Sequence, residues 1–277
     1  MLLKLFKYKL LGEKMGKSIG VLSLKGGVGK TSSVIALGDA ISGFGKKVLL
    51  IDGNLTMPNI GLHLNSFYSP ITLHHILARK NNPRDAIYKT GNFDFIPSSI
   101  FSNLQTNPLD LKDKIKTLKR RYDAVLIDSS PALNEETLGV MLASDEIIVL
   151  TTPDVPSLGS TVKAVKVAKK RGLPIIGIVI TKTNGRDFDL SLKEVEETAG
   201  LPVLAVIPYD INVPKSTSEF TPVTSYKPNS KASKEYRKLA GALIGERVKT
   251  FNLRNFLKIP PRKDEINREI YYSRVFG

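Results

Sequence analysis

The chain contains no cysteine among its 277 residues. This absence excludes a disulfide framework, a thiolate metal site and a thiol nucleophile, and it is consistent with a reducing cytoplasm. No apolar run approaches the roughly 20 residues that a membrane-spanning helix needs. No internal repeat occurs, and no linker is evident before about residue 221. With 42% hydrophobic and 24% charged residues, the composition is that of a soluble protein with one large α/β domain or two small ones.

Acidic residues are scarce relative to basic ones, 26 against 41, which gives a net charge of +15. The excess lies at the two ends. Residues 1–17 contain five lysines and one glutamate, and residues 226–277 contain thirteen basic and five acidic residues. An anionic surface, either membrane lipid or non-specific DNA, is therefore an expected partner. The alternative is that both ends are solubilising tails.

We expect residues 1–17 to form a basic, amphipathic N-terminal extension. Leucines and Phe6 lie along one side of a helical wheel and most of the lysines along the other. Lys9 falls among the apolar side chains, so the amphipathicity is imperfect. Such a helix can lie in a membrane interface or pack on the domain. Met15 is an alternative start of the chain.

The segment 23–32, SLKGGVGKTS, joins a short apolar run to a helical pattern. Strand, glycine-rich turn and helix are the context of a phosphate-binding loop. Glycines let backbone N–H groups turn towards phosphates, and the helix adds the positive end of its dipole. Lys30 would then reach the β- and γ-phosphates and Thr31 would ligate Mg²⁺. We predict that the phosphates of a nucleotide are held by Lys25, Gly26, Gly27, Val28, Gly29, Lys30, Thr31 and Ser32.

Apolar runs alternate with helical patterns across residues 18–250, which we expect to be a single P-loop domain. The apolar runs are 47–51, 93–96, 124–127, 147–151, 175–181 and 203–207, and the helical patterns are 33–43, 72–79, 109–120, 134–143, 158–171 and 189–199. This alternation predicts an α/β fold with a doubly wound, mostly parallel sheet and helices on both faces. Ser230 would cap a last helix that ends near Thr250. Residues 251–277 would follow as a basic C-terminal tail.

Two aspartates stand at the ends of predicted strands, Asp52 after one apolar run and Asp128 after another. Ligands bind at the carboxyl ends of the strands in folds of this kind. Beside a P-loop, a carboxylate in this position supplies an oxygen ligand for Mg²⁺. We therefore predict that Thr31, Asp52 and Asp128 hold the metal.

The octet at Lys25, KGGVGKTS, resembles the deviant Walker A motif of the MinD/ParA family of ATPases. The strict P-loop pattern fails at its first position, where Leu24 replaces glycine, and an ordinary P-loop has no use for the early Lys25. The resemblance implies that Lys25 reaches across an ATP-dependent homodimer to the partner's nucleotide. Residues 122–131 are similar to the Walker B segment of the same family, and residues 48–62 are similar to the switch segment of its MinD branch.

The resemblance fails at Asn54, where the family has an aspartate that orients or activates the attacking water. An amide can orient water but cannot take up its proton at neutral pH. We therefore identify Lys25, Lys30, Asp52 and Asn54 as the catalytic residues and predict slow hydrolysis of ATP.

In the family, adenine is recognised by an asparagine at the end of the sixth strand and by a proline-containing turn after the last one. In this chain Thr181 stands near the asparagine position, and Asn184 is the nearest substitute. Pro208 and Asp210 belong to the later turn. The resemblance therefore implies that Asn184, Pro208 and Asp210 contact the base.

The resemblance implies an ATPase that dimerises on ATP and positions cargo on a membrane or DNA surface, as in placement of the division site or partitioning of chromosomes and plasmids. An activator or cargo protein is then a further partner, and the location is cytoplasmic, with peripheral membrane or nucleoid association. Asn54 favours an alternative, a nucleotide-dependent scaffold with little or no ATPase activity. Iron–sulfur ATPases of this fold need cysteine ligands, and related tyrosine kinases carry a tail rich in tyrosines, where this chain has only Tyr271 and Tyr272.

Overall fold

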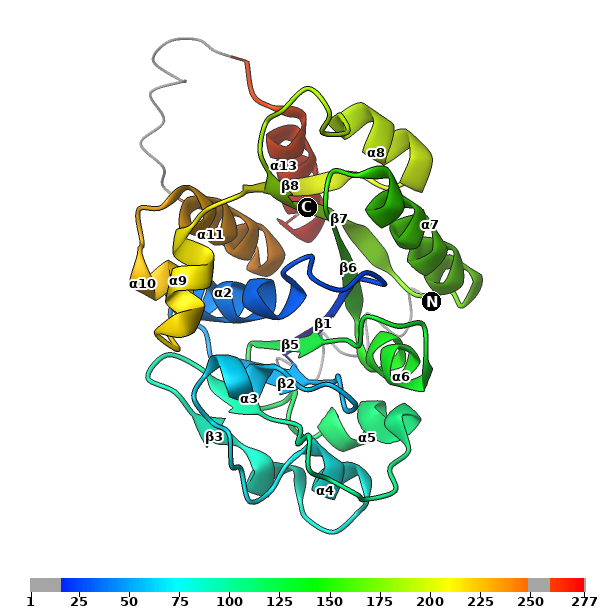
Figure 1. The fold of residues 1–277 in the computed structure, drawn as a ribbon, viewed down its shortest axis with the longest axis vertical. Helices are drawn as coiled ribbons and strands as arrows, with labels where there is room; N and C mark the ends of the chain where they lie inside the picture. Colours follow the sequence, from blue (N-terminus) through cyan, green and yellow to red (C-terminus); the bar gives the residue numbers. More distant parts are fainter. Residues whose placement is uncertain (1–15, 249–259, 277) are drawn as a thin grey trace.

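The computed structural model describes residues 16–248 and 260–276. An eight-stranded sheet runs through this part of the chain, in the order β3-β4-β2-β5-β1-β6-β7-β8 (Figure 1). All neighbouring strands are parallel except β3 and β4. The strands are β1 (Lys17–Leu22), β2 (Val48–Asp52), β3 (Tyr88–Lys89), β4 (Asp94–Ile96), β5 (Ala124–Asp128), β6 (Glu146–Thr151), β7 (Ile175–Thr183) and β8 (Val203–Pro208). The predicted fold class is confirmed.

Helices cover both faces of this sheet (Figure 1). They are α2 (Lys30–Ser42), α3 (Ile60–His63), α4 (Leu73–Leu77), α5 (Leu111–Ile115), α6 (Glu135–Ala143), α7 (Val155–Lys170), α8 (Leu192–Ala199), α9 (Asn212–Ser218), α10 (Val223–Tyr226), α11 (Lys231–Ile244) and α13 (Lys263–Phe276), with 3₁₀ turns η1 (Pro83–Ala86) and η2 (Pro108–Asp110). The helix predicted over 109–120 is shorter than expected. After Ile115 the chain tightens into a turn, because the N–H of Leu118 bonds to the carbonyl of Ile115.

The hydrophobic core lies in two layers, one on each face of the sheet. Successive residues of a strand point to opposite faces, so Leu50 packs with α2 and α11 while Leu49 and Ile51 pack with the helices α4 to α7. This double burial is the reason why the strands are continuous apolar runs in the sequence. It also leaves the two ends of the strands as the places where polar chemistry can collect.

The C-terminal segment differs from the predicted tail. Helix α13 packs against the edge strand β8 (Figure 1). The side-chain amide of Asn267 donates to the carbonyl of Val203 at 2.8 Å, and the Tyr271 hydroxyl donates to Glu146 at 2.8 Å. Two basic residues of α13 meet acidic partners from the domain, Lys263 with Glu196 and Arg268 with Glu235. Residues 263–276 therefore form a helix that packs on the domain.

The other predictions about the ends fall largely outside the described residues. Residues 1–15 contain nearly all of the predicted amphipathic extension, and residues 251–259 of the predicted tail also lie outside the described residues. The last helix before them is capped by Ser230, as expected, but it ends at Ile244 because Gly245 adopts a left-handed conformation. None of the helices in the described ranges has the length and apolar character needed to cross a bilayer.

Candidate nucleotide site

The loop between β1 and α2 lies at the carboxyl ends of the parallel strands. Gly27 and Gly29 have φ angles of 76° and 84°, a left-handed conformation that favours glycine. Gly29 is the residue from which α2 begins. The loop borders a depression of about 240 Å³, which we call the P-loop depression; it is lined by Lys25, Gly26, Gly27, Val28, Gly29, Lys30, Thr31, Ser32, Asn54, Asn59, His63 and Pro131. The structure thus gathers all the predicted P-loop residues around one hollow.

Lys30, Thr31 and Asp128 meet beneath this loop. Lys30 Nζ lies 2.8 Å from Asp128 Oδ1 and also donates to the carbonyl of Ser129. The Thr31 hydroxyl donates to the other oxygen of Asp128 at 2.5 Å. The side chains of Lys30 and Asp128 are only 8% and 1% exposed. A hydroxyl and a carboxylate that face each other beside the phosphate loop are oxygen donors of the type that Mg²⁺ prefers, so these residues fit the predicted metal.

Asp52 lies beside Asp128, since the two residues are in register on β2 and β5. The close approach requires Gly53, because a Cβ there would stand 2.7 Å from the Asp128 carbonyl. Asp52 is fully buried, and its carboxylate accepts hydrogen bonds from the N–H groups of Asn59 and Ile60, both at 2.8 Å. Burial, then the nearby Asp128, raises the pKa of Asp52 to about 7. The carboxylate thus braces the chain ahead of α3, and its role in metal binding stays a prediction.

Asn54 lines the P-loop depression, but its side chain is bonded within its own turn. The amide oxygen accepts from the N–H of Met57 at 3.2 Å, and the amide nitrogen donates to the carbonyl of Met57. Thr56 in the same turn is also held in place, because its N–H and its hydroxyl both donate to Glu136. In this structure Asn54 therefore holds the turn 54–57 in shape.

Lys25 forms contacts that the sequence did not predict. Its Nζ lies 2.9 Å from Asp154 Oδ1 and 2.6 Å from the Ser157 hydroxyl, at the start of α7. Asp154 also caps α7 by accepting from the N–H of Ser157. Burial alone would raise the pKa of Asp154, but hydrogen bonds from Thr152, Lys25 and Ser157 hold it well below its usual value. Lys25 is thus held within its own chain, and its role across a dimer stays a prediction.

His63 lines the P-loop depression, like Asn59, and was not among the predicted site residues. It is the last residue of α3, and its side chain is half-buried. Its ring Nδ1 lies 2.8 Å from the carbonyl oxygen of Asn59. The available signal was position, since His63 directly follows the segment 48–62 that resembles the family's switch.

The three predicted adenine residues lie elsewhere on the carboxyl side of the sheet, and none lines the P-loop depression. Asn184 is exposed, and Pro208 is in register with Thr183 on the neighbouring strand. Asp210 accepts hydrogen bonds from the N–H groups of Asn212 and Ala232. Their contact with a base stays a prediction. The Asp210 carboxylate also joins the turn after β8 to the start of α11 through these two hydrogen bonds.

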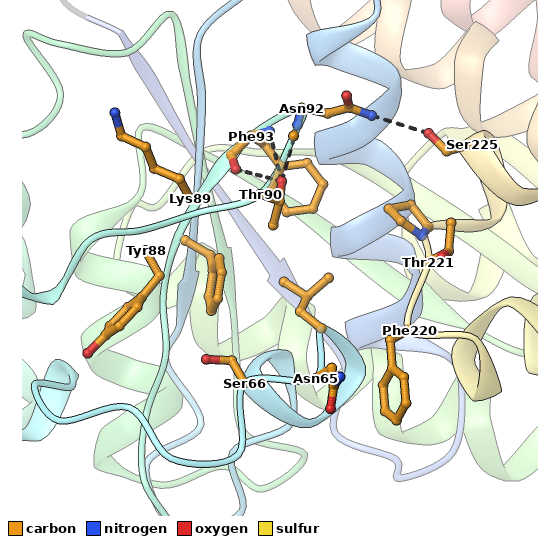
Figure 2. A pocket seen from close by; sticks show the side chains of 14 residues that line it. Asn65, Ser66, Tyr88, Lys89, Thr90, Asn92, Phe93, Phe220, Thr221 and Ser225 are labelled. Carbon is orange, nitrogen blue, oxygen red and sulfur yellow. Dashed lines mark hydrogen bonds between the residues drawn. The ribbon is translucent and has the colours of Figure 1, made fainter.

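A second depression, of about 510 Å³, begins where α3 ends. It lies between residues 64–66, the β3–β4 hairpin and residues 220–225. Figure 2 shows Asn65 and Phe220 on one side of it and Tyr88 on the other, with the amine of Lys89 pointing away from Phe220. Asn65 and Phe220 have φ angles of 56° and 51°. No predicted nucleotide residue lines this hollow, so the smaller P-loop depression is the candidate site.

Comparison with known proteins gives consistent matches. A family profile described as an AAA domain matches residues 16–173, and a ParA profile, described as NUBPL iron-transfer P-loop NTPase, matches residues 115–244. An uncharacterized ATP-binding protein of Methanocaldococcus jannaschii is 34% identical over 231 residues, which cover 82% of this chain and 88% of that protein. The septum site-determining protein MinD of Thermotoga maritima is 28% identical over 248 residues, covering 84% and 90%.

A solved structure is similar as well. The structure of the septum site-determining protein MinD of Pyrococcus horikoshii, complexed with Mg-ADP, matches with a TM-score of 0.78 at 36% identity. The match covers 83% of this chain and 96% of that protein. The similarity therefore extends over most of the chain and not over the P-loop alone.

Proposed function

This chain belongs to the MinD/ParA family of P-loop NTPases, whose members generally hydrolyse ATP, and on that premise we propose that it is an ATP-driven switch. It dimerises when ATP is bound and positions a cargo on an anionic surface. One observation carries the proposal: two lysines, Lys25 and Lys30, line the same P-loop depression and are held by different carboxylates.

The two ion pairs differ in burial, and this difference supports two roles. The pair of Lys30 with Asp128 is buried, so Lys30 stays in the site of its own chain. The pair of Lys25 with Asp154 has both side chains 40% exposed. An exposed pair of this kind contributes only about 0–1 kcal/mol. Lys25 can therefore leave Asp154 at little cost and donate to a nucleotide that a second copy of the chain presents.

The donor groups fit ATP with Mg²⁺. Lys30 and the loop amides suit the phosphates, and the oxygens of Thr31 and Asp128 suit the metal. When bound, the ion would neutralise charge that develops on the phosphates. The Mg-ADP complex of the MinD relative from P. horikoshii supports the same ligands here.

Residues at the opposite end of the sheet support the proposal that the chain binds an anionic surface. A depression of about 610 Å³ lies at the amino ends of β2 and β4, and Lys46, Lys47, Lys89 and Arg121 line it; we call these four residues the basic edge. Lys46 pairs with Glu246 at 2.7 Å. Within residues 16–248 and 260–276, no ion pair is formed by the side chains of Lys47, Lys89 or Arg121. These cations are thus available to phosphate groups of DNA or lipid.

The second candidate function is a scaffold that binds ATP and hardly hydrolyses it. Asn54 is the observation that favours it, because the amide bonds to Met57 through both its nitrogen and its oxygen and cannot accept a proton at neutral pH. Hydrolysis measured with and without the anionic surface separates this scaffold from a true ATPase.

The test is co-sedimentation of the full chain with anionic liposomes and, separately, with double-stranded DNA, each with ATP, with ADP and without nucleotide. We expect ATP to increase binding to one of the two surfaces and to shift the protein from monomer to dimer in size-exclusion chromatography with light scattering. Binding that is the same in all three nucleotide states would contradict a switch.

A further inference from the structure

We propose that His63 takes the proton from the attacking water during ATP hydrolysis, in place of the carboxylate that Asn54 lacks. The inference rests on the proposed ATPase function and names the group that performs its proton transfer. The lining of the P-loop depression supplies the candidate bases. The two lysines there are ammonium groups that already donate to Asp154 and Asp128, and the other lining residues apart from His63 are glycine, valine, threonine, serine, asparagine and proline. His63 is the lining residue that can serve as a base at neutral pH.

Hydrogen bonding fixes the ring in the form that a base needs. A carbonyl oxygen can only accept, so the 2.8 Å contact between His63 Nδ1 and the oxygen of Asn59 requires the hydrogen to be on Nδ1. In a neutral imidazole the lone pair is then on Nε2. No hydrogen bond in the described part of the chain occupies this Nε2. The ring thus has one nitrogen anchored to the backbone and one available as an acceptor.

The backbone that carries the ring is fixed as well. The carboxylate of Asp52 accepts from the N–H groups of Asn59 and Ile60, and the N–H of His63 donates to the same Asn59 carbonyl at 3.0 Å. The buried end of β2 therefore determines where the imidazole lies relative to the P-loop. Asp52 acts in this arrangement as a positioning residue for His63.

Asn54 cannot compete for the role. Its amide oxygen and nitrogen both bond to Met57, and an amide has no site that accepts a proton at neutral pH. The substitution that removes the expected carboxylate thus occurs in a chain that places an imidazole against the same depression.

In the proposed step, water attacks the γ-phosphate and His63 accepts the proton of the water. The water oxygen forms a bond to the γ-phosphorus, and the bond from that phosphorus to the β–γ bridging oxygen breaks with its electron pair remaining on ADP. The water proton moves to His63 Nε2, and the bond from Nδ1–H to the Asn59 carbonyl stabilises the imidazolium. The half-buried ring then returns the proton to solvent.

Single-turnover hydrolysis in four proteins tests the inference: wild type, His63→Ala, Asn54→Asp and the double variant. General-base assistance is typically worth about 10²–10⁴-fold, so we expect His63→Ala to slow the wild type by at least about tenfold. The Asn54→Asp carboxylate would take over the proton, so His63→Ala should slow that background by less than about threefold. Added imidazole should restore part of the rate of the His63→Ala protein by filling the space that the ring leaves.

The controls exclude a purely structural effect. Leu62→Ala changes the exposed neighbour of His63 on α3 and should leave hydrolysis unchanged. Binding of a fluorescent ATP analogue and thermal melting should be the same in wild type and His63→Ala. An equal loss in both backgrounds, no loss at all, or loss of ATP binding in step with the rate would overturn the inference.

The proposed ATPase function fails in a different way. If the Asn54→Asp protein binds ATP but no variant turns it over, the chain is a scaffold and the role of His63 falls with the ATPase. If Asn54→Asp is active and the wild type is not, the ATP site is competent and only the inference about His63 is wrong.

Discussion

The two ends of the parallel strands carry charged residues in opposite ways. At the carboxyl ends, the charges of Lys30 and Asp128 are buried and bonded to each other. At the amino ends, three cations of the basic edge, Lys47, Lys89 and Arg121, are exposed to solvent. A charge in a low-dielectric setting interacts strongly with a single partner, whereas exposed charges act together and are screened by salt. A single substitution at the carboxyl ends should therefore have a large effect on ligand binding. At the basic edge, a large effect should require several substitutions together.

The largest effect is expected from Lys30→Ala. With ATP bound, Lys30 would form a buried, hydrogen-bonded charge pair with the phosphates. Truncating one partner of such a pair costs about 2–5 kcal/mol, so ATP affinity should fall by at least about 30-fold. Titration with a fluorescent ATP analogue measures this loss. The control Lys193→Ala removes a lysine whose side chain is 76% exposed, and it should bind ATP normally. A Lys30→Ala protein that binds within threefold of wild type would place the phosphates elsewhere.

Lys25→Ala should leave ATP affinity unchanged and prevent the dimer. Each lost hydrogen bond to a charged phosphate is worth about 1.5–3 kcal/mol, and a symmetric interface loses two of them. Light scattering in saturating ATP gives the fraction of dimer. The matched variant is Asp154→Asn, which keeps a good cap for α7 but releases Lys25, so it should dimerise at least as well as wild type. Normal dimerisation of Lys25→Ala would remove its role across the interface.

The basic edge should respond only when several of its cations are removed. Replacing Lys47, Lys89 and Arg121 together by alanine should weaken binding to DNA or anionic lipid by about tenfold at low salt, and for DNA the slope of log affinity against log salt should fall by about 2–3. The control replaces three exposed lysines elsewhere, Lys193, Lys215 and Lys231. Equal losses in both triple variants would indicate that net charge, and not the basic edge, attracts the surface.

The difference between the two ends also explains what the sequence predicted. Asp128 and the P-loop were predictable because strand, turn and carboxylate follow one another locally, and the parallel sheet followed from continuous apolar runs. The contact of Lys25 with Asp154 was not predictable, since the two residues lie 129 positions apart in the sequence. His63 was missed because one histidine after a switch segment has no periodicity to mark it. The net charge of residues 226–277 suggested a tail, whereas the structure pairs Arg268 with Glu235 across two helices.

The smallest effect concerns α13, whose last turns reach the amino ends of the central strands. The Tyr271 hydroxyl accepts from Lys17 Nζ at 2.7 Å and donates to Glu146 at 2.8 Å, so it joins β1, β6 and α13. Burial, then the nearby Glu146 carboxylate, raises the pKa of Tyr271 well above its usual value, so the hydroxyl keeps its proton at neutral pH.

Removing that hydroxyl tests whether α13 belongs to the domain. An intramolecular hydrogen bond contributes about 0.5–1.5 kcal/mol net, and Lys17 and Glu146 still pair with each other when the hydroxyl is gone. Tyr271→Phe should therefore lower the free energy of unfolding in urea by about 1 kcal/mol, with no change in ATP affinity because the strands separate the two ends. Ser273→Ala, at an exposed position on the same helix, should unfold like wild type. If Tyr271→Phe also unfolds like wild type, α13 adds nothing to stability through this contact. The C-terminal residues would then behave as the tail predicted for 251–277 and not as part of the domain.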